Sequence, residues 1–305
     1  MAHRIRRLIP VFFIGIALVA PGQTSSVSAH AESVQNKAIT LSPASTEIAV
    51  DPGATTTKSM DIINSGSDAF GVEISSSPYY VSGLDYDPHF TQLPGTVDAS
   101  AWVHLSKTKA NVAGNETLSV PYTVTVPQGT PPGGYYAVLF AETSSDESKN
   151  GVVSHNRVGD ILYITVNGAI KSGGNLTGSS LPKLGFIGSI PITTKISNTG
   201  GAHFVTKAVY TITDMTGKQV YSATTERYVL PQTERQITSS WTPQALFGIF
   251  TVHRSATIAG KQQALPDEKI VIINPWVFVI VAFLLGILIG VPYQRARQRR
   301  RSNKN

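Results

Sequence analysis

The side chains that could carry out catalysis or hold a metal are scattered along this sequence. The histidines outside the two ends lack the spacing of metal ligands, so we interpret them as surface or turn residues: His89, His104, His155, His203 and His253. No nucleophile elbow, dinucleotide fingerprint, P-loop or His-Glu-x-x-His motif occurs. We therefore expect a protein without enzymatic activity and without a cofactor.

Acidic and aromatic side chains gather in one long stretch without a strand pattern, Ser82–Ser100. Asp85, Asp87 and Asp98 lie in it without the spacing of a calcium loop, so we interpret them as solvated turn residues, with calcium binding as the alternative.

Four aromatic residues mark the same stretch as a candidate binding loop: Tyr79, Tyr80, Tyr86 and Phe90. Aromatic side chains on a loop at one end of a β-sandwich are typical of glycan-binding or protein-binding sites. The alternative is that half of them pin the loop to the core.

The elements around this loop are β-strands. Short runs rich in β-branched residues, bounded by Gly, Pro, Asn and Ser, recur from residue 38 to residue 269. We expect an all-β chain with two Ig-like β-sandwiches in tandem, the first over residues 32–170 and the second over 181–269. The Gly- and Ser-rich residues 171–180 are predicted to form the linker between them.

The two predicted sandwiches contain similar short segments. Asn64-Ser65-Gly66 in the first corresponds to Asn198-Thr199-Gly200 in the second, and Gly134–Val138 resembles Gly248–Val252. Divergence from one ancestral sandwich predicts such pairs, whereas the independent use of Asn-x-Gly turns is the alternative.

The N-terminus has the pattern of a secretory signal peptide over residues 1–31. Arg4, Arg6 and Arg7 precede the apolar run Leu8–Ala20, and a small-x-small cleavage pattern ends at Ala31. An uncleaved anchor is the alternative. The exact cleavage site stays open because a second pattern ends at Ala29.

Near the C-terminus, residues 270–293 are predicted to form one transmembrane helix, because no charged side chain interrupts them. Trp276 and Tyr293 lie where interfacial aromatic residues are expected. The alternatives are a buried core helix and a sortase signal, but Leu265-Pro266-Asp267-Glu268 lacks the Thr and Gly of that signal. A basic tail, residues 294–305, follows, with Arg295, Arg297, Arg299, Arg300 and Arg301 as anchoring residues.

The basic residues at the two ends explain the net charge of +6. The region between the signal peptide and the tail contains 16 of the 25 Lys and Arg and all 19 acidic residues, a net charge of −3. The positive charges therefore indicate orientation in a membrane, with the C-terminus in the cytoplasm, and we expect no nucleic-acid partner. The lack of cysteine excludes disulfides and a lipoprotein anchor.

Within the predicted helix, small residues recur at every fourth position: Ala282, Gly286 and Gly290. Such a face lets two transmembrane helices approach closely, so it is a candidate for homodimerisation. The general frequency of Gly in membrane helices is the alternative explanation.

Several segments resemble bacterial Ig-like, PapD-like surface domains. These are SPASTEIAVDPGATTTKSMDIINSG, AGNETLSVPYTVTVP and PPGGYYAVLFAE. The layout is similar to that of the WxL-interacting proteins of Gram-positive bacteria. This resemblance implies binding to peptidoglycan or to another surface protein, but it transfers no contact residue.

Together these features predict a non-catalytic attachment protein of a bacterial cell surface. We expect a single-pass type I membrane protein, with its N-terminal region outside the cell, that contacts a cell-wall polysaccharide or an exported protein. The first alternative is an accessory subunit that presents or stabilises another exported protein, and the second is a cell-wall enzyme. The sequence identifies neither the ligand nor the oligomeric state.

Overall fold

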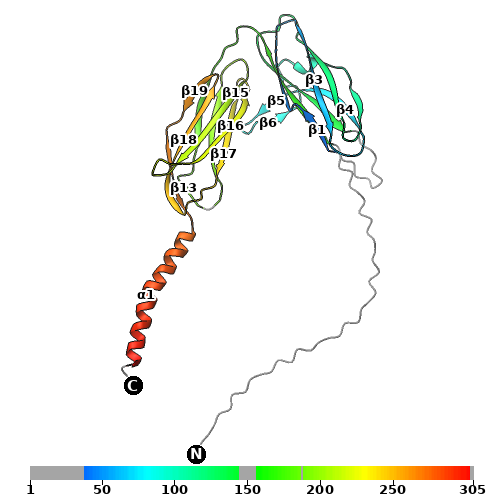
Figure 1. Ribbon diagram of the computed structural model, residues 1–305. Helices are drawn as coiled ribbons and strands as arrows, with labels where there is room; N and C mark the ends of the chain where they lie inside the picture. Colours follow the sequence, from blue (N-terminus) through cyan, green and yellow to red (C-terminus); the bar gives the residue numbers. More distant parts are fainter. Residues whose placement is uncertain (1–37, 144–155, 187, 303–305) are drawn as a thin grey trace, which may run out of the picture. The chain divides into compact units, whose positions relative to one another are not determined.

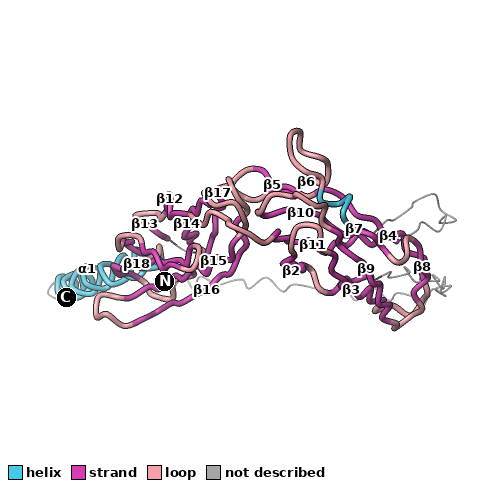
Figure 2. The backbone as a smooth tube through the Cα atoms, turned by 90° about the horizontal axis from the view of Figure 1, so that it is seen from above, coloured by secondary structure: helices cyan, strands magenta, loops and turns pink. Residues whose placement is uncertain are grey.

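The computed structural model describes residues 38–143, 156–186 and 188–302, with side chains up to Arg295. Residues Asn36–Asn305 belong to one compact unit. The predicted signal peptide, His155 and most of the connection between strands β10 and β11 lie outside the described residues. Figure 2 shows that, within the described residues, helix is confined to the C-terminal α1 (Trp276–Ser302) and the short η1 (Ala99–Trp102), and the other described residues are strand and loop, in agreement with the predicted β-rich fold.

The N-terminal sandwich consists of two sheets with the strand orders β1-β3-β9-β7 and β2-β11-β10-β4-β8, and a small β5-β6 hairpin stands beside them. Most neighbouring strands are antiparallel, but β2 runs parallel to β11. The bounds are β1 Ile39–Ser42, β2 Ser45–Val50, β3 Thr55–Asn64, β4 Phe70–Pro78, β5 Tyr80–Ser82, β6 Asp87–His89, η1 Ala99–Trp102, β7 Val103–Leu105, β8 Lys109–Val112, β9 Thr117–Thr125, β10 Gly133–Thr143 and β11 Arg157–Val166.

The C-terminal sandwich has the strand orders β12-β14-β17 and β13-β20-β18-β15-β16, with β19 paired to β18 (Figure 1). Here β13 runs parallel to β20. The bounds are β12 Gly174–Ser180, β13 Leu184–Gly185, β14 Ile190–Asn198, β15 Phe204–Thr213, β16 Gln219–Val229, β17 Glu234–Trp241, β18 Phe247–Ile258, β19 Lys261–Ala264 and β20 Glu268–Ile273, and the helix α1 is Trp276–Ser302.

Both sandwiches follow one topology, and their two buried asparagines show it at atomic detail. Asn64 ends β3 and Asn198 ends β14, and each is almost fully buried. Each side-chain oxygen accepts a hydrogen bond from the amide two residues later, Gly66 or Gly200. Each side-chain nitrogen donates to the carbonyl four residues later and to the end of a facing strand. The two predicted Asn-x-Gly matches thus occupy equivalent places in the fold.

The alternation of apolar side chains along the strands builds two hydrophobic cores. The first lies between the N-terminal sheets and includes Met60, Ile62 and Leu139. The second includes Ile192, Tyr210 and Ile212 of the C-terminal sheets, and it also takes in Val81, Tyr86 and Tyr163 from the N-terminal part of the chain. The N-terminal sandwich thus contributes directly to the second core.

The structure differs from the sequence-based boundaries at two places. Residues 174–180 of the predicted linker form strand β12, which pairs with β14. Its Gly174 is needed for close packing, because a Cβ there would lie 2.7 Å from the Ser197 carbonyl oxygen. The helix begins at Trp276 rather than Ile270. Residues 270–273 belong to β20, in which Ile270 and Ile272 are buried and Val271 and Ile273 lie on the outer face. Because the outer residues are apolar as well, the sequence does not show the apolar–polar alternation that would have identified a strand.

The helix begins as its local sequence dictates. The side chain of Asn274 accepts a hydrogen bond from the Trp276 amide at 3.1 Å, which is the geometry of an N-cap. Pro275 follows the cap, where its missing N–H is not needed.

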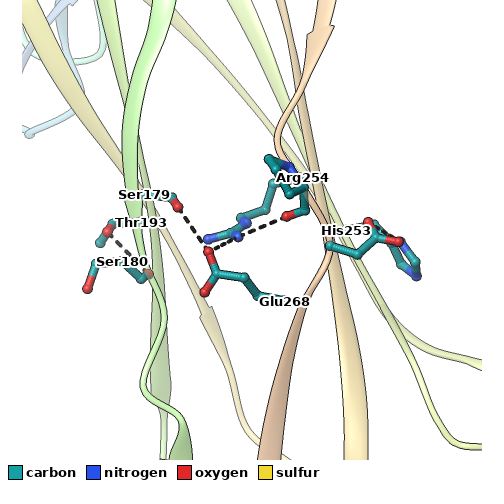
Figure 3. Close-up of polar contacts among 8 residues, drawn as sticks. Ser179, Ser180, Thr193, His253, Arg254 and Glu268 are labelled. Atoms are coloured by element: carbon teal, nitrogen blue, oxygen red, sulfur yellow. Dashed lines mark hydrogen bonds and ion pairs between the residues drawn. The ribbon is translucent and has the colours of Figure 1, made fainter.

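The strand that leads to the helix is tied to the sandwich by a buried charge, as Figure 3 shows. Arg254 on β18 is 2% exposed and donates to the Glu268 carboxylate on β20 at 2.6 Å. Ser179 on β12 donates to the same carboxylate oxygen at 3.4 Å. Beside this pair, His253 and Asp267 form a second contact at 2.8 Å. Strand β20 is therefore fixed by the Arg254–Glu268 ion pair as well as by its backbone hydrogen bonds.

Candidate binding site

A pocket of about 480 Å³ lies beside the stretch that carries the sequence-predicted aromatic residues. Its floor and walls come from the start of β10, from residues 78–81 and 91–97, and from the turn between β16 and β17. The lining residues are Pro78, Tyr79, Tyr80, Val81, Thr91, Gln92, Leu93, Thr96, Val97, Gly134, Tyr135, Tyr136, Leu230, Pro231, Gln232 and Thr233. Aromatic rings and aliphatic groups thus surround a few amide and hydroxyl groups, the usual composition of a ligand pocket.

The first wall is a loop that is ordered by its own hydrogen bonds. Leu93-Pro94-Gly95-Thr96 forms a turn in which the Thr96 amide donates to the Leu93 carbonyl, and Gly95 has φ +82°. Proline followed by a residue with positive φ is the signature of a type II turn. The Gln92 side chain closes the loop by donating to the Thr96 carbonyl at 2.7 Å. The loop is therefore preformed.

This loop also holds the exposed large apolar side chains of the N-terminal sandwich. In the described part of residues 38–166, these are Phe90, Leu93 and Val97, and Val97 is 54% exposed. Phe90 packs edge-on against Phe140, with ring centroids 4.9 Å apart, and lies 6.3 Å from the Tyr79 ring. A cluster of exposed apolar side chains around a pocket is typical of an interaction site.

The four predicted aromatic residues have different roles. Tyr79 and Tyr80 line the pocket, and Phe90 is exposed beside it. Tyr80 stacks on His89 with ring centroids 4.6 Å apart, which fixes its orientation. Tyr86 is only 7% exposed and points into the C-terminal sandwich, so it cannot contact a ligand from solution.

Tyr86 instead fastens the loop to the second sandwich. Its hydroxyl oxygen accepts a hydrogen bond from the Leu230 amide at 3.0 Å and also bonds to the Thr233 hydroxyl. The Arg235 guanidinium lies 4.2 Å from the centre of its ring. Burial raises the pKa of the Tyr86 hydroxyl, so the group stays neutral. The prediction that half of the aromatic residues pin the loop applies to this one.

The second wall of the pocket is the turn Leu230–Thr233, which was not predicted to belong to a binding site. Gln232 has φ +58°, and its amide donates to the Asn198 carbonyl at 2.9 Å. Its side chain donates to the Gly200 carbonyl at 3.1 Å. The repeated Asn-x-Gly turn therefore positions this wall, which is the signal that could have pointed to it.

Aromatic rings join the two sandwiches next to the pocket. Tyr163 of β11 stacks on Tyr228 of β16, and the His203 ring packs against both. The Tyr136 hydroxyl, which lines the pocket, accepts a hydrogen bond from the His203 amide at 3.1 Å. Burial lowers the pKa of His203. His203 lies in the connection between β14 and β15 and belongs to the framework of the pocket.

The predicted metal-binding alternative finds no support in the described residues. They contain no group of three or more acidic, histidine or cysteine side chains that could hold a metal ion. The Asp98 carboxylate caps η1 by accepting from the Ser100 amide and hydroxyl.

The C-terminal helix has the length and composition of a membrane span. Trp276–Arg295 has a mean hydropathy of 2.5, and none of it is buried against the rest of the described chain. This is consistent with a membrane anchor. Trp276 and Tyr293 lie at the two ends of this stretch, and a side chain added at Gly286 or Gly290 would meet nothing within 4 Å. The small-residue face is thus open, and its role in pairing stays a prediction.

The solved structures that match this chain do so at low identity and with TM-scores below 0.5. No family model and no curated protein matches the sequence. Among solved structures, the class 5 fimbriae chaperone CfaA matches with 9% identity and a TM-score of 0.40 over 76% of this chain and 99% of its own. The Escherichia coli chaperone DraB matches with 12% identity and a TM-score of 0.39 over 75% and 98%. The PapD-like domain 7 of human CEP192 matches with 16% identity and a TM-score of 0.32 over 52% and 99%.

These proteins are PapD-like and chaperone–usher Ig-like β-sandwich domains at low identity. Nothing in the comparison points to the WxL-interacting proteins in particular, so this resemblance stays a prediction.

Proposed function

We propose that this chain is a non-catalytic attachment protein that binds a cell-wall polysaccharide in the pocket between the loop 91–97 and the turn Leu230–Thr233. The observation that carries the proposal is the pocket itself, in which Tyr79, Tyr80 and Tyr135 surround a few neutral polar groups. Aromatic rings with a polar edge suit partners that present both C–H and hydroxyl groups.

The polar groups of the pocket agree with an uncharged or weakly charged ligand. The side-chain oxygens of Gln92 and Gln232 can accept hydrogen bonds, and the Thr91 hydroxyl can donate or accept, all without a formal charge. The Thr96 and Thr233 hydroxyls donate to backbone carbonyls and can still accept. The lining contains no Lys, Arg, Asp or Glu. A neutral polymer with many hydroxyl groups fits this set better than a nucleic acid or a strongly acidic partner would.

The proposal includes the topology that the sequence predicts. The two sandwiches are separate Ig-like domains that are exported behind a cleaved signal peptide, and α1 is a permanent single-span anchor with the basic tail in the cytoplasm. The Arg254–Glu268 ion pair supports the role of α1 as an anchor. It connects β20, which leads into the helix, to the core of the C-terminal sandwich, so that a pull on the helix is passed to the sandwich.

A second candidate function is an accessory subunit that holds another exported protein by strand pairing. It is favoured by β16, an 11-residue strand at the edge of its sheet that pairs only with β15 among the described strands. An edge strand of this length offers a row of backbone groups to an incoming strand.

The two functions are separated by two binding assays with the full chain in detergent. The first measures sedimentation with purified cell walls, and the second measures retention of proteins from a wall-free membrane extract. The proposal predicts wall binding that Tyr80→Ala weakens and Thr224→Lys, on the outer edge of β16, leaves unchanged. The accessory function would be favoured instead if the parent chain did not bind walls but retained a protein from the membrane extract, and if Thr224→Lys abolished that retention.

A further inference from the structure

The C-terminal sandwich exposes a group of large apolar side chains beside the strand that leads to α1. We name it the exit patch and define it by six residues: Leu184, Phe186, Leu246, Phe247, Ile249 and Val271. All six are exposed, and Phe247 reaches 69%.

The strand register makes the exit patch continuous. Val271 of β20 lies between Leu184 of β13 and Ile249 of β18 in one row across three strands. Phe247 pairs with Ile273 two positions further along β20. Because Ile270, Ile272 and Phe250 point into the core, these alternate residues all face outward on one side of the sheet.

Chain connectivity places the exit patch beside the proposed membrane span. Phe247 pairs with Ile273, only three residues before Trp276, and the Asn274 amide donates to the Leu246 carbonyl at 2.7 Å. Three residues at about 3.3 Å each, added to the separation of about 5 Å across the strand pair, place Phe247 within roughly 15 Å of the first turn of α1, whatever angle the helix takes.

The distribution of exposed apolar side chains in this sandwich is one-sided. Met215 and Val220, the other two near this end, flank the turn between β15 and β16. Among the described residues, only Val205 is an exposed large apolar side chain at the opposite end, where β15 begins. Solvent exposure alone does not explain why such residues gather at the membrane-proximal end.

A lysine completes the pattern expected at a lipid interface. Lys269 precedes Val271 by two residues on the same outward face of β20, and it is exposed. Along the outward face of β20, the apolar Ile273 and Val271 thus lie nearest the span, and the basic Lys269 lies further from it. That order matches the boundary between acyl chains and anionic headgroups.

We propose that the exit patch inserts into the surface of the membrane that α1 spans, so that the sandwich rests on the lipid by Phe186, Leu246 and Phe247. This inference depends on the membrane anchor in the proposed function. A lipid surface is the occupant that continuity with the span supports, and the test below distinguishes it from a second copy of the chain.

The absence of cysteine from the chain allows a direct test, since each substitution introduces a single labelling site. Full-length Phe247→Cys, Val205→Cys and Leu284→Cys are labelled with an environment-sensitive fluorophore. They are reconstituted in vesicles of phosphatidylcholine and phosphatidylglycerol, with or without lipids that carry nitroxide quenchers at the headgroup and along the acyl chain. Position 284 reports the span, and position 205 is the control at the far end of the same sandwich.

We expect the quenchers to lower emission from positions 247 and 284 by roughly half, and emission from position 205 hardly at all, because only the first two lie within the interface or the core. Phe186→Cys should behave like Phe247→Cys, which guards against a local effect of one label.

Quenching at 284 with none at 247 and 186 would overturn the inference and leave the anchor intact. No quenching at 284 would remove the anchor and the inference together. A third outcome would assign the patch to a second copy of the chain and also overturn the inference. In that outcome, the emission of the label at position 247 is blue-shifted but the lipid quenchers do not lower it. In addition, two copies of the unlabelled Phe247→Cys chain form a disulfide crosslink.

Discussion

The rings of Tyr163 and Tyr228 stack with their centroids 4.0 Å apart and their planes 17° apart, and this contact joins the N-terminal sandwich to the C-terminal one. His203 packs on both rings, at 5.1 Å from Tyr163 and 5.8 Å from Tyr228. The pocket lies beside this cluster because Tyr136, which lines it, bonds to His203. The geometry of the proposed site therefore depends on how firmly the two sandwiches are joined.

The first prediction concerns pH. Burial holds the pKa of His203 below its ordinary value of 6.5, although Glu47 nearby acts in the opposite direction. The unfolded chain therefore binds a proton more readily than the folded chain, so His203 lowers stability as the pH falls through 6.5. His203→Gln should reduce the loss of melting temperature between pH 7.5 and pH 5. An unchanged pH profile would show that His203 titrates freely.

A second prediction tests Tyr86 as the fastener of the loop. Tyr86→Phe removes the acceptor of the Leu230 amide and should lower the free energy of unfolding by about 1–3 kcal/mol, because a buried N–H loses its partner. Urea denaturation in detergent measures this change. Thr91→Ala, at an exposed position of the same loop, is the control and should change stability by less than about 0.5 kcal/mol. Equal effects of the two substitutions would contradict the assignment.

A third prediction concerns the strand that leads to the helix. Glu268→Gln leaves the buried Arg254 guanidinium without its anionic partner and should lower the free energy of unfolding by about 3 kcal/mol. The matched control is Glu226→Gln, whose exposed pair with Lys207 is 3.9 Å long and should contribute at most about 1 kcal/mol. If both changes have the same small effect, the exit strand is not held by this ion pair.

A fourth prediction uses the buried carboxyl of the N-terminal core. Burial raises the pKa of Asp160 from 3.8 to about 6, and the Thr46 hydroxyl donates to it at 2.8 Å. The folded chain therefore binds the proton more tightly, so Asp160 lowers stability as the pH rises from about 4 to 6. Asp160→Asn should be more stable than the parent at pH 7.5, by up to about 3 kcal/mol, and similar to it near pH 4.

Melting curves at both pH values check the Asp160 prediction, and the sign of the effect is opposite to that of His203. A variant that is less stable than the parent at pH 7.5 would show that the ionised carboxylate is satisfied in the folded chain.

The sequence predicted the architecture because strand alternation and turn residues are local properties. Asn64 and Asn198 could be matched from three letters each, since the same buried hydrogen bonds need the same Asn-x-Gly residues. The start of the helix was misplaced because Val271 and Ile273 are as apolar as their buried neighbours. A strand with two apolar faces cannot be distinguished from a membrane span by composition.

The site was predictable only in part. The aromatic loop could be seen in the sequence, but its second wall, Leu230–Thr233, lies about 140 residues further along the chain and meets it through tertiary contacts. For the same reason, Tyr86 could not be separated from Tyr79 and Tyr80 before the fold was known. Its burial depends on the Leu230 amide and on Arg235, which no local pattern identifies.

A sedimentation isotherm of the full chain with purified cell walls decides whether the pocket binds wall polymer. The pocket variant is Tyr80→Ala with Leu93→Ser. The matched control is Val220→Ser, at an exposed apolar residue near the start of β16, whereas the pocket lies beyond the end of that strand. We expect an apparent Kd at least about tenfold higher for the pocket variant and unchanged for the control, since loss of two contact side chains removes about 1.4 kcal/mol or more. Equal affinity of the pocket variant and the parent, with both folded, would show that the pocket is not the wall-binding site.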